Sequence, residues 1–155
     1  MKVDDPTALD VLWRCMVARI ATLSSNGRPS INPLYFIYQN GHIWLGTADW
    51  TLAARNVKAD PRVSVLFEIE RDHTDHRVLR ISGRASVNTD PQVWRLNERF
   101  TACKYILTPG GLRSYLTHFR LLQPMHYYHA QSAEKGRPCV IDLIPERAEF
   151  LNADR

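Results

Sequence analysis

Two pairs of histidines are spaced so that each pair could bind one metal ion. His73 and His76 are three residues apart, and so are His126 and His129. On a helix this spacing places both imidazoles on one face, within reach of the same ion. A protein metal site needs further ligands, and no third ligand is evident near either pair. We therefore predict no metal site, and interpret the first pair as part of a polar loop and the second as part of an aromatic-rich interface segment.

The other residue types that could do chemistry form no catalytic pattern. The three cysteines, Cys15, Cys103 and Cys139, are widely spaced, and no CxxC pair occurs. An odd number of distant cysteines argues against a disulfide scaffold and a zinc cluster, and favours a reducing, cytoplasmic location. The spacing of serine, histidine and aspartate supports no catalytic triad. We therefore predict no catalytic side chain.

The composition is that of one folded domain covering residues 1–155. The chain is 45% hydrophobic and 23% charged, and its formal charge is +4. A small basic excess suits a phosphorylated small molecule, while a nucleic-acid-binding protein would be expected to show a basic run or an aromatic RNP-type strand. The apolar runs are too short to span a bilayer, and no secretory signal is visible. We expect neither a nucleic acid nor a membrane as a partner.

Short strands with tight turns dominate the expected secondary structure. Asp5-Pro6 is typical of a helix start, Asn40-Gly41 predicts a type I′ hairpin, and Gly83 predicts a bulge within a strand. The expected strands are 18–23, 29–38, 42–47, 62–69, 77–88 and 139–144, with 148–151 as a possible continuation, and the expected helices are 6–17, 49–59, 89–105 and 112–122. This order predicts a mainly β fold with flanking helices, arranged as a six-stranded antiparallel barrel.

Residues 10–90 resemble the FMN-binding split barrel of the pyridoxamine 5′-phosphate oxidase-like superfamily. The resemblance rests on a strand that ends in Gly46-Thr47, a short helix with Arg55-Asn56, the segment Asp60 to Phe67 and the strand containing Ile81 to Ala85. It implies a six-stranded antiparallel split β-barrel that forms a homodimer, with the flavin in a groove between the two chains. It also implies a flavin-dependent oxidoreductase with a small-molecule substrate. Because the superfamily includes haem-handling members, the histidine pairs are also candidate haem ligands.

The resemblance implies where FMN would bind. The ring would lie along the second strand, and the phosphate would lie where the third strand ends and the next helix begins. A helix N-terminus offers free N–H groups and a positive dipole end to an anion, and threonine hydroxyls add donors. Asn56, by contrast, is expected to form structural hydrogen bonds. The candidate cofactor-binding residues are Asn32, Pro33, Leu34, Tyr35, Gly46, Thr47, Trp50, Thr51 and Arg55.

Four positions depart from the pattern of the oxidase itself. Ile31, Phe36, Leu52 and Ala53 are apolar where the oxidase carries basic residues. Each missing charge-assisted hydrogen bond is worth about 1.5–3 kcal/mol, so we expect FMN to bind with about micromolar affinity. A lysine introduced at position 53 would test whether its absence is the cause. The candidate substitutes for the missing cations are Arg28, Arg55, Arg62 and Arg77.

The characteristic C-terminal motif of the true oxidases is also absent, so we predict that the protein is not a pyridoxamine-phosphate oxidase. The arginine-rich, lysine-poor composition is typical of a GC-rich genome, and some relatives use the deazaflavin F420. F420 is therefore an alternative cofactor, and an F420-dependent reductase is an alternative function. A cofactor-free dimeric barrel that binds another ligand is the non-enzymatic alternative. The aromatic density of residues 90–130 predicts that this segment contributes to the homodimer interface.

Overall fold

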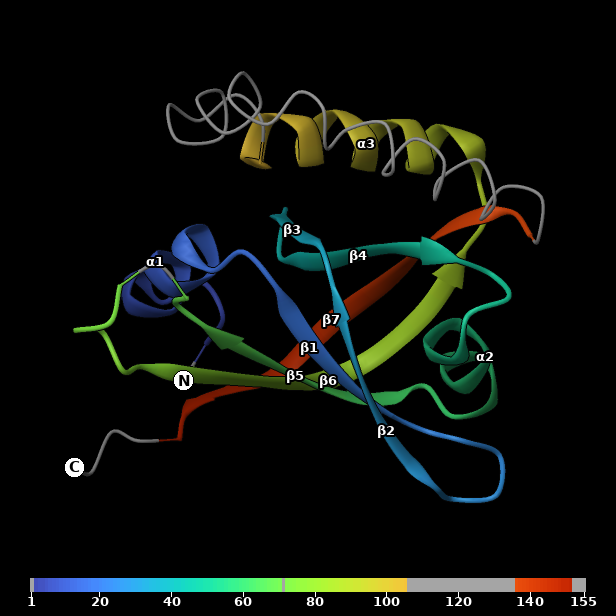
Figure 1. The fold of residues 1–155 in the computed structure, drawn as a ribbon, viewed down its shortest axis with the longest axis horizontal. Helices are drawn as coiled ribbons and strands as arrows, with labels where there is room; N and C mark the ends of the chain where they lie inside the picture. Colours follow the sequence, from blue (N-terminus) through green and yellow to red (C-terminus); the bar gives the residue numbers. More distant parts are fainter. Residues whose placement is uncertain (1, 71, 106–135, 152–155) are drawn as a thin grey trace.

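The strands form one curled antiparallel sheet (Figure 1). The computed structural model describes residues 2–70, 72–105 and 136–151. In these ranges the strands are β1 (Ala18–Leu23), β2 (Pro29–Leu34), β3 (Phe36–Gln39), β4 (His42–Ala48), β5 (Arg62–Glu68), β6 (Val78–Asn88) and β7 (Pro138–Phe150), in the sheet order β2-β1-β5-β6-β7-β4-β3. The predicted mainly β split barrel is confirmed as a half-barrel. It has seven strands rather than six because the predicted strand 29–38 is divided at Tyr35.

Three helices are described, and local capping determines where each begins. Helix α1 (Pro6–Arg14) has Asp5 as its N-cap, whose carboxylate accepts the Thr7 N–H at 2.9 Å. Helix α2 (Leu52–Ala59) begins after its N-cap Thr51, three residues later than predicted. Helix α3 (Pro91–Tyr105) agrees with the prediction, and the predicted helix 112–122 lies outside the described residues. No helix among the described residues is long and apolar enough to cross a membrane.

The predicted turn and bulge residues have the expected conformations. Asn40 and Gly41 join β3 to β4 with φ angles of 51° and 83°, which confirms the hairpin. The register between β6 and β7 shifts at Ser82/Gly83, which confirms the bulge. A Cβ at Gly83 would collide with the backbone carbonyl oxygen of Ile144. Because this bulge lets β7 continue past Pro145, the two predicted C-terminal strand segments form one strand.

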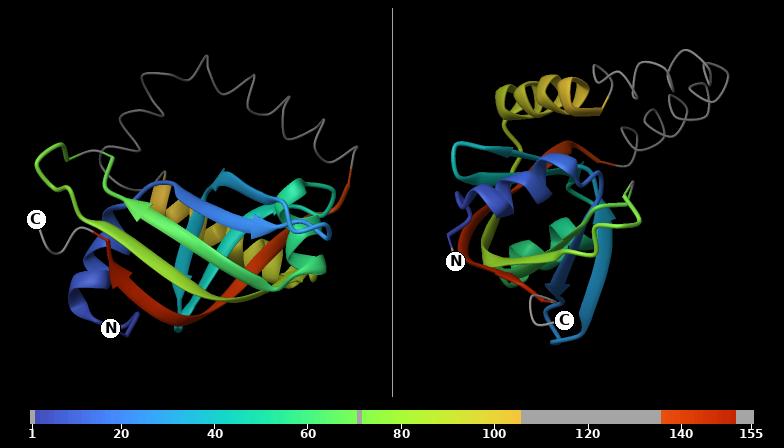
Figure 2. Two further views of the ribbon diagram at one scale, coloured as in Figure 1. Left: turned by 90° about the horizontal axis from the view of Figure 1, so that it is seen from below. Right: turned by 90° about the vertical axis from the view of Figure 1, so that its left-hand side faces the viewer.

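The core lies inside the curl of the sheet, between α1 and α2 (Figure 2). Alternating residues of β1 and β5 point inward, as expected for a sheet with one buried face. Helix α1 packs against β5, and α2 packs against β1, β2 and β6. Helix α3 lies against β3, β4 and β7. The largest fully buried side chains are Phe36, Phe67, Leu12, Ile20, Ile43, Leu45, Leu79, Ile81, Ile141 and Leu143.

Candidate functional site

The end of β4 and the beginning of α2 bring the two predicted threonines together. Thr51 Oγ1 caps α2 by accepting the Ala54 N–H at 3.4 Å, and it donates to the Ala48 carbonyl oxygen at 2.8 Å. The Thr47 hydroxyl oxygen lies 3.1 Å from Thr51 Oγ1. Because the single hydroxyl hydrogen of Thr51 goes to Ala48, Thr47 donates to Thr51. The hydroxyls therefore form a short chain of hydrogen bonds at the start of α2.

The first turn of α2 also presents backbone donors. The first intrahelical hydrogen bond joins the Arg55 N–H to the Thr51 carbonyl oxygen at 3.0 Å. The N–H groups of Leu52 and Ala53 come before it and have no acceptor within the helix. They lie at the positive end of the helix dipole, which favours an anion. An anion here could also accept the Thr47 hydrogen at the cost of one neutral hydrogen bond.

The residues predicted to line a flavin ring lie on two faces of β2. Ile31, Pro33 and Tyr35 are exposed, whereas Asn32 and Leu34 are half-buried, and Leu34 packs against the core. Asn32 Oδ1 is buried and has no hydrogen-bond donor within the described residues. An orphaned acceptor of this kind would suit the N–H of a bound ring. The exposed face forms an apolar row along an edge strand of the sheet.

Gly46 lies between β3 and α3, at the position where β4 approaches the helix. Its N–H donates to the Tyr35 carbonyl oxygen at 3.3 Å. A Cβ at this position would lie 2.9 Å from Asn97 Nδ2 and 3.6 Å from the ring of Trp94. Glycine is therefore needed for α3 to approach the sheet, and Gly46 has a structural role alongside any contact with a ligand.

The residues just before β7 pair with the turn between β4 and α2, a contact that the sequence did not predict. The Asp49 N–H donates to the Arg137 carbonyl oxygen at 2.9 Å, and Asp49 Oδ1 accepts the Arg137 N–H at 3.0 Å. The half-exposed Trp50 follows Asp49 and lies close to Gly136. These contacts join residues 88 positions apart. No local signal could have found them, because they depend on the pairing of β4 with β7.

Asn56 has the structural role that was expected for it. Its Nδ2 donates to Thr22 Oγ1 and to Ser30 Oγ, both at 3.0 Å, and the side chain is buried. These bonds attach the inner face of α2 to β1 and β2. The position of the helix terminus is therefore fixed by the barrel, and Asn56 is not available to a ligand.

Comparison with known proteins identifies the family of this chain. A sequence profile described as pyridoxamine 5′-phosphate oxidase matches residues 5–152. The chain belongs to the pyridoxamine 5′-phosphate oxidase family. Membership in this family, together with the half-barrel, confirms the resemblance found in the sequence. A comparison with curated protein sequences gave no significant match.

Solved structures of the same fold have different functions. An F420 reductase is 19% identical, with 90% of this chain and 94% of that chain covered and a TM-score of 0.62. A conserved hypothetical protein of Mycobacterium tuberculosis is 19% identical, with coverages of 96% and 85% and a TM-score of 0.68. The haem storage protein HutZ of Vibrio cholerae is 17% identical, with coverages of 97% and 95% and a TM-score of 0.63. At these identities the similarity shows a shared fold and does not assign a function.

The four apolar positions that set this chain apart from the oxidase fall into two classes. Phe36 and Ala53 belong to the core, where they are 1% and 2% exposed. Ile31 and Leu52 are 66% and 44% exposed. Phe36 packs edge to face on Phe67 with ring centroids 4.8 Å apart. Two of the four positions therefore face the interior and could not carry a charge toward a ligand in this structure.

The candidate substitute arginines also separate into two groups. Arg62 pairs with Asp60 at 2.6 Å, and Arg77 pairs with Asp10 and Asp75. Arg28 and Arg55 are exposed, and neither has an ion-pair partner among the described residues. Arg55 lies one turn into α2, and helical side chains lean toward the N-terminus, so its guanidinium can reach the first turn. Arg55 thus remains a candidate phosphate ligand.

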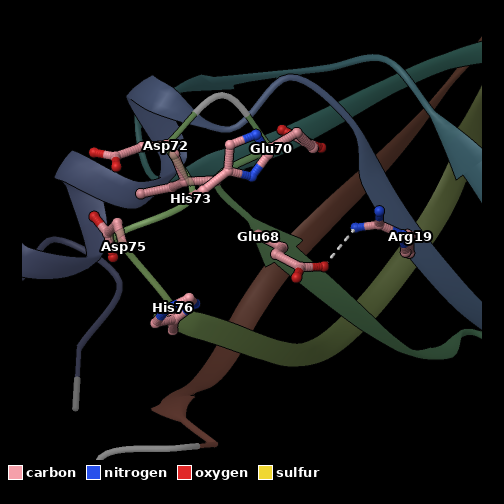
Figure 3. A pocket seen from close by; sticks show the side chains of 8 residues that line it. Arg19, Glu68, Glu70, Asp72, His73, Asp75 and His76 are labelled. Carbon is pink, nitrogen blue, oxygen red and sulfur yellow. Dashed lines mark ion pairs between the residues drawn. The ribbon is translucent and has the colours of Figure 1, made fainter.

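A polar cavity of about 230 Å³ lies beside α1 and the loop between β5 and β6 (Figure 3). Its lining residues are Arg19, Glu68, Ile69, Glu70, Asp72, His73, Asp75 and His76. The carboxylates are already engaged: Glu70 accepts the N–H groups of Met16 and Val17, and Asp72 and Asp75 pair with Arg14. Within the described residues, no group of three metal-ligating side chains could hold an ion. His126 and His129 lie outside those residues.

A second helix end, that of α1, is closed by Lys104. Lys104 Nζ donates to the Leu12 carbonyl oxygen at 3.0 Å and lies 3.4 Å from the centre of the Phe36 ring. The neighbouring Tyr105 hydroxyl donates to the Phe36 carbonyl oxygen at 2.9 Å. Burial lowers the pKa of Lys104 to about 8, and burial raises the pKa of Tyr105. These contacts dock the end of α3 onto α1 and β3.

Proposed function

We propose that this protein is a flavin-binding oxidoreductase with FMN as cofactor and a small-molecule substrate other than pyridoxamine 5′-phosphate. The observation that carries the proposal is the juxtaposition of Thr47 and Thr51 at an open helix N-terminus, on a chain of the oxidase family. F420 is the alternative cofactor. One structural neighbour is described as an F420 reductase, and a deazaflavin would use the same elements of the site.

The bound cofactor would supply the redox chemistry by accepting and donating electrons at its ring. The protein would supply position and shielding. Thr47 and the first N–H groups of α2 would bind the phosphate, and Asn32 would offer its unpaired Oδ1 to a ring N–H. The apolar row of Ile31, Pro33 and Tyr35, on the other face of the strand from Asn32, would contact a second chain and exclude water. No side chain of this chain is assigned a proton-transfer step.

The proposed assembly is a homodimer. Ile31, on the edge strand β2, is 66% exposed, and Tyr35, just after that strand, is 59% exposed; a second copy of the chain would bury them. Light scattering at micromolar concentration should give the mass of a dimer. Ile31→Glu should give a folded monomer, because a charge would be buried in the interface, whereas Leu151→Glu at another exposed apolar position should remain dimeric. A wild-type monomer would contradict this part of the proposal.

Fluorescence quenching tests the cofactor directly. The purified protein is titrated separately with FMN and with F420, and about micromolar affinity is expected for one of them. Thr47→Val keeps the shape of the side chain but removes the donor, so FMN affinity should fall by about 3- to 10-fold, as for one neutral hydrogen bond. Thr89→Val, at an exposed position before α3, is the matched control and should bind like the wild type.

The second candidate function is a cofactor-free dimeric barrel that binds another apolar or anionic ligand. The apolar residues at the four positions that are basic in the oxidase favour it, because they remove the cations that strengthen phosphate binding. Saturable binding of FMN or F420 would reject this alternative. Absence of binding by both would reject the flavin proposal in its favour.

A further inference from the structure

Arg137 immediately precedes β7 and lies beside Asp49, in the turn between β4 and α2. Two hydrogen bonds between Arg137 and Asp49 hold the two segments together, at 2.9 and 3.0 Å. The β4–β7 register continues this pairing, with Ala48 opposite Pro138 and Thr47 opposite Cys139. Figure 1 shows α2 on the same side of the barrel as the end of β4 and the start of β7. Arg137 is therefore placed within the group of elements that forms the proposed phosphate site.

Gly136 allows the chain to pass this close to Asp49 and Trp50. A Cβ at Gly136 would lie under 3.0 Å from both Asp49 Oδ1 and Trp50 Cδ1. The absence of a side chain lets the backbone pass directly over Asp49 and Trp50, and it sets Arg137 beside them. Trp50 is itself a candidate to cover the cofactor, so the arginine adjoins a residue already assigned to the site.

An anion bound at the start of α2 would need a nearby cation, because Asp49 is negatively charged. Asp49 lies in the turn that precedes α2, and its carboxylate would repel a phosphate bound at the helix start. One oxygen of that carboxylate accepts the Arg137 N–H, but no ion pair among the described residues uses the Arg137 guanidinium. Arg137 is exposed, and its charge can therefore offset Asp49 and remain available to a ligand.

We propose that Arg137 is the residue by which this site distinguishes a phosphorylated flavin from its phosphate-free form. The inference rests on the proposed function and adds a cation that the sequence pattern did not indicate. Arg55 belongs to α2 and Arg137 precedes β7, so the two cations would come from different segments and would together replace the missing basic side chains of the oxidase. Arginine suits this task because its planar guanidinium can donate two parallel hydrogen bonds to a phosphate.

Parallel titrations with FMN and with riboflavin, which lacks the phosphate, test this role. Wild-type protein should bind FMN at least tenfold more tightly than riboflavin. Arg137→Ala should lower FMN affinity about tenfold and leave riboflavin affinity unchanged, and Arg137→Lys should recover part of the loss. Arg147→Ala is the matched control: Arg147 is exposed at the other end of β7 and pairs with Glu149, so its removal should leave both affinities unchanged.

Each other result overturns a distinct part of the inference. Unchanged FMN affinity in Arg137→Ala would show that the arginine is a surface charge. An equal loss for FMN and riboflavin would show that Arg137 only supports the structure of the site. If wild-type protein binds neither FMN nor riboflavin and also fails to bind F420, the proposed function itself is wrong, and this role for Arg137 falls with it.

Discussion

The beginning of α2 and the end of α1 differ in how their unpaired backbone groups are satisfied. Both helix ends leave backbone groups without intrahelical partners. At the end of α1, Lys104 donates to the Leu12 carbonyl oxygen, and Glu70 accepts the N–H groups of Met16 and Val17. At the start of α2, Thr51 caps one N–H group and those of Leu52 and Ala53 precede the first intrahelical bond.

This difference indicates which end is available to a ligand. The protein's own side chains satisfy backbone groups at the end of α1, and the carboxylates of the neighbouring polar cavity are already engaged there. The start of α2 combines donors with exposed residues, including Trp50 and Leu52. The two helices lie on opposite sides of the barrel (Figure 1). A change at the end of α1 should therefore alter stability alone, while a change of an exposed residue at the start of α2 should alter ligand affinity.

The largest effect is expected from a lysine introduced at Ala53 or at Leu52. These residues are neighbours in α2, but the first is buried and the second is exposed. Ala53→Lys would bury an ammonium in the core and should lower the free energy of unfolding by about 3 kcal/mol or more. Leu52→Lys, one residue earlier but exposed, should change stability by about 0.5 kcal/mol and raise FMN affinity about tenfold, or 1.4 kcal/mol.

Urea unfolding measures the first quantity, and FMN fluorescence measures the second. Equal stability of the two lysine variants would contradict the assignment of Ala53 to the core. A stable Leu52→Lys variant with unchanged FMN affinity would contradict the proposed phosphate site but not the fold.

Leu52 and Ala53 also show which features could not be predicted from the sequence. The Asp5 cap, the Asn40-Gly41 hairpin and the Gly83 bulge follow from local backbone rules, and the structure has all three. From the sequence, position 53 was the obvious place to restore a lysine. Only the packing of α2 on β1, β2 and β6 turns Ala53 inward and Leu52 outward. The approach of Arg137 to Asp49 likewise depends on long-range strand pairing that no local motif encodes.

A smaller effect is expected when the cap of α2 is removed. Thr51→Ala should lower the free energy of unfolding by about 1 kcal/mol, within the range of 0.5–2 kcal/mol found for lost N-caps. It also leaves Thr47 without its acceptor at 3.1 Å. Thr51→Ser keeps the hydroxyl and should retain most of the stability. Thermal or urea unfolding of the three proteins makes the comparison, and a Ser variant as unstable as the Ala variant would show that the methyl group, and not the cap, matters.

The smallest effect concerns the closed end, where Lys104 should make stability depend on pH. Its pKa is about 8 in the folded protein, below the ordinary lysine value of 10.5, because burial disfavours the ammonium. Between pH 8 and pH 10.5 Lys104 is therefore protonated to a greater extent in the unfolded chain than in the folded protein, and its contribution to stability rises with pH. From pH 8 to pH 9 the rise should be at most about 1 kcal/mol, since solvent screens a half-buried group.

Two thiols act in the opposite direction over the same range, so the wild-type profile alone does not isolate Lys104. Burial raises the pKa of Cys15, and burial raises the pKa of Cys139 to about 11, so the folded state retains protons that the unfolded state loses. Lys104→Met keeps both thiols and removes only the amine. Urea unfolding at pH 7, 8 and 9 should therefore show the wild type gaining stability relative to this variant as the pH rises. A constant difference across the three pH values would mean that Lys104 is solvated like a surface lysine, and the contrast between the closed and open helix ends would lose its electrostatic basis.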